Sequence, residues 1–144
     1  MAKKYLDLDG LKTFYNKLNV LFNDINSAIT NINSYLDFLQ SSSVGGSSIT
    51  NINVNTKLHV VNVSSDQTLA LTGGTGGGSV APAGRDVHII IKNTATNEVA
   101  ITMPTGSNNV LVCEPVYYVE PGKYLEINVI SDGSKAYYRV AEQG

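Results

Sequence analysis

The chain has 144 residues, a formal net charge of −2, 42% hydrophobic residues and only 15% charged residues. A chain of this length usually forms one domain, with room for an appended helix, and the hydrophobic content is ordinary for a protein that buries a core. Lys and Arg are not clustered anywhere in the sequence, so we expect no nucleic-acid partner, because phosphate neutralisation needs such a cluster.

The opening residues, MAKKYLDLDG, have no apolar segment after their lysines, so we expect no secretory signal peptide. No apolar run reaches the roughly 18 residues that would span a bilayer, so we expect no membrane insertion. Cys113 is the single cysteine and has no base beside it in the sequence. We interpret it as a small buried apolar residue, and we expect a protein that is made in a cytoplasm and folds without oxidation.

Residues 1–40 are predicted to form a coiled-coil helix. Their apolar side chains recur at alternating spacings of three and four over about four heptads, which is typical of the a and d positions of a coiled coil. Asp7 or Asp9 can cap the first turn, and the small residues of Ser41–Ser48 are expected to end the helix. Val20 and Phe38 are apolar residues outside the pattern. The predicted self-association residues are Leu11, Phe14, Leu18, Leu21, Ile25, Ala28, Ile32, Tyr35 and Leu39.

The apolar stripe is wider than the seam of a two-stranded coiled coil. A further apolar residue follows each d position, and Ile25 and Ile32 occupy a positions, which together favour three or more helices. Much of the remaining helix surface is Asn, Ser and Thr, so the helix must gain its stability by burying the stripe. Its partner is either other copies of the chain or the chain's own globular domain. The unbroken period favours copies of the chain. The second apolar row is Tyr15, Phe22, Ile29 and Leu36.

The pentapeptide ITNIN occurs twice, at Ile29–Asn33 inside the heptad pattern and at Ile49–Asn53 outside it. From Ile52 onwards the apolar residues alternate with a period of two, which indicates extended chain. We therefore predict that the first copy is helical and the second extended, and that the repeat is coincidental. Residues 41–56 are predicted to form a Ser- and Gly-rich linker followed by an extended segment.

Residues 57–144 are predicted to form a small antiparallel β-sandwich or jelly-roll-like head, which places the whole chain in the α+β class. About eight short strands follow one another without an intervening helix, as is typical of such folds. Residues 120–123 suit a type II turn, and residues 132–133, Asp-Gly, predict a hairpin. The predicted strands are Leu58–Val63, Gln67–Leu71, Asp86–Asn93, Asn97–Met103, Val110–Cys113, Val116–Glu120, Tyr124–Ile130 and Lys135–Ala141, and Leu125, Ile127 and Val129 are assigned to the core.

The sequence contains no pattern that indicates catalysis or metal binding. The Gly-rich stretch Thr72–Gly84 lacks the Lys and Ser/Thr of a phosphate loop, so we predict a mobile surface loop. His59 and His88 are too few for an ordinary metal site in one chain, although a threefold axis could bring three copies of one histidine together. No nucleophile has an evident base, and no carboxylates are paired for acid–base work. We therefore expect no enzyme, no cofactor and no metal.

Tyrosines are concentrated near the carboxyl end of the chain. Adjacent residues in a strand point to opposite faces, so each Tyr-Tyr pair should expose one ring unless an interface covers it. Such rings serve packing, subunit contacts or ligand stacking, with packing favoured. The candidate interface or ligand surface comprises Tyr117, Tyr118, Tyr124, Tyr137 and Tyr138.

Two runs, one near each end of the chain, are similar to sequences of a known family. The opening run YLDLDGLKTFY, residues 5–15, resembles the start of virion structural proteins of phages and prophages from gut bacteria. The run VEPGKYLEINVISDG, residues 119–133, followed by YYRV at residues 137–140, is similar to the end of small phage fibre heads. The resemblance implies a trimeric appendage with a coiled-coil stalk and a β-rich head on a capsid or tail. It implies no particular catalytic or binding residues.

These observations predict a non-enzymatic virion structural protein, made in the bacterial host and located in the virion. It would be a homotrimeric component of a head or tail fibre that attaches to the particle or contacts the host surface. Its partners would be copies of itself, other virion proteins and, as a candidate ligand, a host-surface glycan. Two alternatives stay open: a carbohydrate-binding or adhesin-like β-sandwich module of a bacterium, and an assembly factor whose helix docks on another virion protein.

Overall fold

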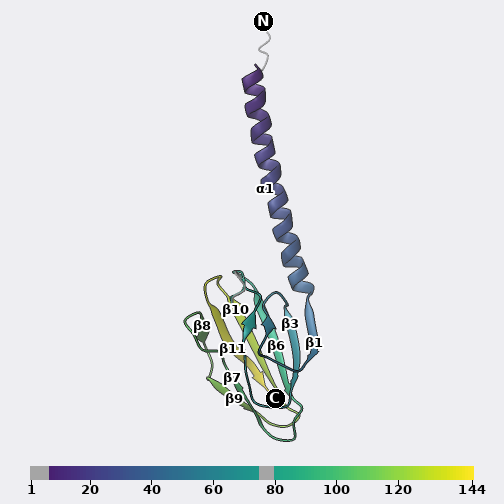
Figure 1. The fold of residues 1–144 in the computed structure, drawn as a ribbon, viewed down its shortest axis with the longest axis vertical. Coiled ribbons are helices and arrows are strands. Elements are labelled where there is room, and N and C mark those ends of the chain that lie inside the picture. Colours follow the sequence, from purple (N-terminus) through teal and green to yellow (C-terminus); the bar gives the residue numbers. More distant parts are fainter. Residues whose placement is uncertain (1–6, 75–79) are drawn as a thin grey trace. The chain divides into compact units, whose positions relative to one another are not determined.

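The computed structural model describes residues 7–74 and 80–144. The chain divides between Asp37 and Phe38 into two compact units. The first contains most of helix α1, which runs from Leu8 to Gln40, and the second, here called the β unit, holds the strands (Figure 1). The coarse prediction of a long helix followed by a β-rich region is confirmed.

Helix α1 begins where the sequence suggested. The Asp7 carboxylate accepts a hydrogen bond from the backbone N–H of Gly10 at 2.7 Å, which satisfies one of the free donors of the first turn. The first helical bond runs from the Leu11 N–H to the Asp7 carbonyl at 3.0 Å. Asp7 is therefore the capping residue. The helix ends at Gln40, immediately before the small residues that were expected to end it.

Phe38 belongs to the β unit although it lies in the last turn of α1. It is the one buried residue among those of the helix that the structure describes, with 2% of its surface exposed. The Lys57 ammonium lies 5.8 Å and the Arg85 guanidinium 5.0 Å from its ring centre, within the range of cation–π attraction. Phe38, one of the two apolar residues outside the heptad pattern, is thus a core residue of the β unit.

The β unit contains one large and two small sheets. The large sheet, labelled in Figure 1, has the strand order β1-β3-β6-β10-β11-β8. The small sheets are β2-β5 and β4-β7-β9. The strands are β1 (Ser42–Gly46), β2 (Ile52–Asn53), β3 (Leu58–Val63), β4 (Gln67–Thr68), β5 (Leu71–Thr72), β6 (Asp86–Asn93), β7 (Val99–Thr102), β8 (Asn109–Leu111), β9 (Val116–Val119), β10 (Tyr124–Ser131) and β11 (Ala136–Gln143).

The prediction of an antiparallel head is wrong. Five of the eight strand pairs in the described residues are parallel: β1–β3, β3–β6, β2–β5, β4–β7 and β8–β11. Strands β1–β2, β3–β5 and β6–β7 form three successive windings, in which each strand pairs with one in the adjacent winding. Parallel pairing requires a long crossover, usually a helix. Here extended segments in the small sheets carry the crossover, so a chain without helices between its strands still pairs them in parallel.

Residues 41–56 differ from the linker expected there. Ser42–Gly46 forms β1 at the edge of the large sheet, in parallel register with β3. Ile49, Ile52 and Val54 are all buried, at 0–2% exposure. The alternation of apolar residues was a core signal as well as a signal of extended chain. Of the two ITNIN copies, Ile29–Asn33 is helical as predicted, whereas the second copy is extended only at Ile52–Asn53, in β2, because residues 49–51 form a bend and a turn.

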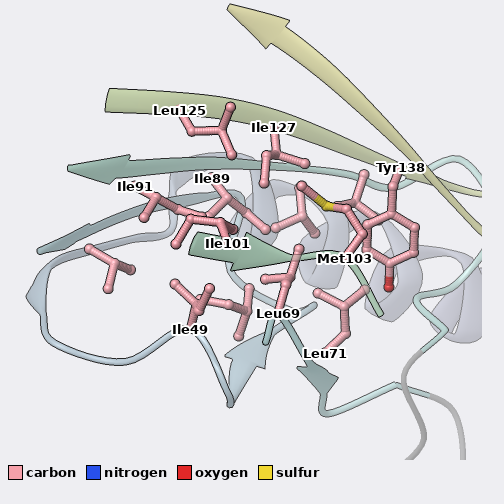
Figure 2. Packing of buried hydrophobic residues seen from close by; sticks show 14 of the residues in the cluster. Ile49, Leu69, Leu71, Ile89, Ile91, Ile101, Met103, Leu125, Ile127 and Tyr138 are labelled. Atoms are coloured by element: carbon pink, nitrogen blue, oxygen red, sulfur yellow. The ribbon is translucent and has the colours of Figure 1, made fainter. Parts of the chain in front are cut away.

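The core lies between one face of the large sheet and the small sheets. Figure 2 shows Leu125 and Ile127 of β10 above Ile89 and Ile91 of β6, with Ile101 and Leu69 facing them from β7 and the β4–β5 segment. Strand β10 buries every second residue, so the prediction that Leu125, Ile127 and Val129 are core residues is confirmed, at 0–3% exposure.

Both predicted turns form. Gly122 has φ 76° and the Lys123 N–H reaches the Glu120 carbonyl at 3.1 Å, as a type II turn requires. Gly133 has φ 89° in the β10–β11 hairpin. The predicted strand at Gln67–Leu71 instead splits into β4 and β5. The middle of the Gly-rich stretch, residues 75–79, lies outside the described residues.

Candidate self-association face and tyrosine groove

The apolar residues of α1 form a continuous exposed stripe, here called the self-association face. Leu39 has 41% of its surface exposed, and Phe14 and Ile32 have 59%. Leu18 is half-buried and Ala28 is exposed. The second row is equally open, at 47–61%. The face thus comprises the nine predicted self-association residues together with Tyr15, Phe22, Ile29 and Leu36.

The opposite face of the same helix carries small, neutral polar side chains. A shallow hollow there is lined by Asn23, Asn26, Ser27, Thr30 and Asn31. The hydroxyl of Ser27 donates to the Asn23 carbonyl at 2.9 Å, and that of Thr30 donates to the Asn26 carbonyl at 3.0 Å. Both hydroxyl groups therefore form hydrogen bonds with backbone carbonyls of the helix itself. The two faces therefore differ sharply: one offers apolar area, the other small neutral groups.

The structure separates the five candidate tyrosines. Tyr138 is fully buried, and its hydroxyl donates to the Asn109 side-chain oxygen at 3.0 Å. Burial raises the pKa of the Tyr138 phenol above its ordinary value. Tyr117 is partly buried against the core, and its hydroxyl accepts a hydrogen bond from the Glu114 N–H at 3.0 Å. Tyr138 is therefore a core residue and does not belong to a ligand surface.

Tyr137 closes the β10–β11 hairpin. Its hydroxyl donates to Asp132 at 2.8 Å, and this bond raises the pKa of the Tyr137 phenol. The other Asp132 oxygen accepts the N–H groups of Ser134 and Lys135 at 2.8 and 2.7 Å. These two backbone bonds are the main cause of the lowered Asp132 pKa, and the Tyr137 bond adds to it. The role of Tyr137 is thus local to the turn.

Tyr118 is the most exposed of the five, with 59% of its surface accessible. It lines a groove of ≈ 300 Å³ together with Glu98, Glu120, Lys123 and Gln143, and we call this the Tyr118 groove. Gly144, which also lines it, exchanges two backbone hydrogen bonds with Tyr124, at 2.7 and 3.0 Å. The pKa of the Tyr124 phenol is raised mainly by a hydrogen bond to Glu142 and, to a smaller extent, by desolvation. Of the predicted tyrosine surface, Tyr118 is the residue that lines this groove.

Buried Asn93 holds the segments around the Tyr118 groove. Its side-chain N–H groups donate to the carbonyls of Asn97 and Val119, both at 2.8 Å, and its side-chain oxygen accepts the Ala95 N–H at 2.7 Å. Its backbone N–H donates to the Lys123 carbonyl at 2.9 Å, and its carbonyl accepts the Gly122 N–H at 3.0 Å. The sequence analysis missed this residue. The signal was present, because Asn93 continues the core-facing series of Val87, Ile89 and Ile91 with a period of two.

The histidines and the cysteine take structural positions. His59 is buried on the core face of β3, and its Nε2 atom lies 3.0 Å from the Asn53 carbonyl oxygen. The Nε2 atom of His88 lies 2.7 Å from the Oε1 atom of Glu126. Cys113 is half-buried beside the core, and burial raises the pKa of its thiol. In residues 7–74 and 80–144, no group of three His, Cys, Asp or Glu side chains is arranged to hold a metal ion.

No protein-family model matches the chain, and no curated protein or solved structure is significantly similar to it. Among the described residues, no helix is both long and apolar enough to cross a membrane. The geometry of the self-association face and of the Tyr118 groove is therefore the basis for assigning a function.

Proposed function

We propose that this chain is a non-enzymatic structural protein that forms a homotrimer through the self-association face of α1. The observation that carries the proposal is the exposure of that face, where every large apolar side chain of the heptad except half-buried Leu18 has 41–59% of its surface accessible in one chain. Monomeric proteins rarely expose contiguous apolar patches of this kind, and those that do usually use them for contact.

Energetics support association. Fully burying a Leu, Ile or Phe side chain contributes about 1.5–3 kcal/mol, and the face presents more than ten apolar residues. The helix needs this contribution, because Asn, Ser and Thr on its other face are weak helix formers and an isolated helix is marginal in water. Ile25 and Ile32 at a positions, with the second apolar row, favour three or more helices over two.

The biological role that we propose is that of a fibre-type virion component, attached to a phage particle or contacting the host surface. Support comes from the resemblance of the two chain ends to phage appendages and from the order of a rod-like helix followed by a β unit. Holding three β units together would make three weak contacts act as one stronger contact, without catalysis. Other virion proteins are the proposed partners for attachment.

The experiment that tests the proposal is the solution mass of the intact protein across a range of concentrations. Sedimentation equilibrium should give three times the 15.4 kDa chain mass, with dissociation on dilution. A monomer at every concentration contradicts self-association. A dimer or tetramer contradicts the assigned stoichiometry.

A second candidate function, a bacterial carbohydrate-binding or adhesin-like module, is favoured by the Tyr118 groove alone. Such a module would act as a single chain with one strong site. A monomer that binds one sugar tightly would therefore favour it over the fibre component.

A further inference from the structure

The Tyr118 groove is assembled from segments that are far apart in the sequence. Glu98 immediately precedes β7, Tyr118 lies in β9, Glu120 and Lys123 stand at the two ends of the type II turn, and Gln143 ends β11. The Gln143 amide donates to the Tyr118 carbonyl at 2.7 Å, which ties β11 to β9. The groove is thus a product of the tertiary fold and not of one flexible loop.

Its walls are preorganised from beneath by Asn93. This residue is 0% exposed, and burying an amide is costly unless its hydrogen bonds are made. The Asn93 side chain donates hydrogen bonds to the backbone carbonyls of Asn97, which precedes Glu98, and Val119, which follows Tyr118. Its backbone holds the turn that carries Lys123. One buried residue therefore fixes three walls, and preorganised walls lower the entropic cost of binding.

The lining chemistry selects a class of ligand. An exposed tyrosine ring offers a flat apolar face, which sits opposite the apolar face of a sugar ring in carbohydrate sites. Glu98, Glu120, Lys123 and Gln143 supply acceptors and donors for hydroxyl groups around it. Two carboxylates against one ammonium leave the lining negative, which disfavours acidic sugars. The volume of ≈ 300 Å³ lies at the lower end of the ~300–1,000 Å³ range of small-molecule sites.

We propose that the Tyr118 groove binds a neutral saccharide. The inference deepens the proposed function, and rests on it for the role of host-surface contact, by naming the ligand class and the residues that recognise it. The single site is open and shallow, so its dissociation constant is expected to be on the order of 1 mM, and three sites in one particle would gain strength by multivalency.

The test uses the full chain and saturation-transfer NMR with a panel of soluble sugars. The neutral members are glucose, galactose, mannose and N-acetylglucosamine, and sialic acid is the acidic member, each at about 10 mM so that a ~1 mM site is occupied. At least one neutral sugar should bind, and sialic acid should bind more weakly. Failure of every neutral sugar to bind, or preferential binding of sialic acid, overturns the proposal.

Two variants locate the binding. Tyr118→Ala removes the exposed ring without touching the core and should weaken binding at least about tenfold, or about 1.4 kcal/mol. Tyr137→Ala, the matched control, removes a tyrosine that bonds to Asp132 outside the groove and should leave binding unchanged. Equal binding by the native protein and Tyr118→Ala contradicts the assignment of the site.

Sedimentation of the same samples separates this proposal from the proposed function. A trimer that binds no neutral sugar disproves the saccharide site and leaves the trimer standing. A monomer whose sugar binding is lost in Tyr118→Ala disproves the trimer and leaves the saccharide site standing, because single-site binding in solution does not depend on the number of copies.

Discussion

Helix α1 exposes most of its apolar side chains, whereas the β unit buries most of its own. Ile127 in β10 is fully buried, whereas Ile32 in α1 has 59% of its surface exposed. The β unit buries its own apolar residues in a core drawn from residues 38–138. The helix has an equally regular pattern that one chain leaves uncovered. The comparison teaches that the stability of the β unit should be intrinsic, whereas that of the helix should depend on protein concentration.

The largest expected effect breaks the association of the helices. Replacing both Ile25 and Ile32 by Asp would bury uncompensated charges in the proposed seam, each costing several kcal/mol, so the proposed trimer should dissociate completely to monomers. Analytical ultracentrifugation measures the mass, and circular dichroism should show loss of helix but not of β structure. An unchanged mass would rule out the seam.

A control places two similar charges on the opposite face of the same helix. Asn23→Asp with Thr30→Asp alters residues that line the polar hollow. This variant should sediment with the same mass as the native protein, because these side chains stay in water. Dissociation of this variant as well would mean that added charge, and not its position, disrupts the protein.

The next largest effect tests where the β unit begins. Phe38→Ala should destabilise the β unit by about 3–5 kcal/mol, because it removes a buried ring from the core and leaves a cavity. Leu36→Ala, two residues earlier in the same helix, changes a side chain with 47% of its surface exposed and should leave the unfolding of the β unit unchanged. Denaturant unfolding followed by near-ultraviolet circular dichroism measures both. Similar losses in the two variants would mean that the helix and β unit unfold together.

The smallest expected effect appears only at alkaline pH and is confined to the β unit. Burial raises the folded-state pKa of Tyr138, so the neutral phenol is held in the folded protein while the unfolded chain ionises near pH 10. The stability that Tyr138 contributes is complete below pH ~10 and is lost as the pH rises towards the folded pKa, by at most about 1.4 kcal/mol per pH unit.

Tyr138→Phe isolates this effect from the other tyrosines. The variant loses the bond to Asn109, which costs about 1 kcal/mol at any pH, but it carries no phenol to ionise. Denaturant unfolding from pH ~8 to ~11 should therefore show a steeper loss of stability in the native protein than in the variant. Parallel curves would contradict the assignment of alkaline sensitivity to Tyr138.

Local signals predicted the elements of this fold well. Asp7 capped the helix, and the period of two placed Leu125, Ile127 and Val129 in the core. The turn at Gly133 joined β10 to β11. Each of these features depends on residues close together in the sequence, where backbone preferences and side-chain spacing decide the outcome.

The pairing of strands that are far apart in the sequence could not be predicted from the sequence. Strand β1, with the sequence SSVGG, has the composition of a linker and is a strand because β3 offers it an edge. Glycine and serine carry little β preference, so tertiary context decides their state. The parallel windings could not be predicted for the same reason, since no helix marks the crossovers. The Tyr118 groove was foreseen only as one tyrosine among five, because its other walls meet through the fold.

The position of Phe38 has a consequence for how genes encoding such proteins can be recombined. A genetic exchange at the visible end of the helix, after Gln40, would deprive the incoming β unit of a ring that its core requires. A crossover upstream of Phe38 would deliver a complete unit onto a rod of different origin. Rods exchanged in evolution are therefore expected to end before this position, leaving the aromatic residue with the strands that cover it.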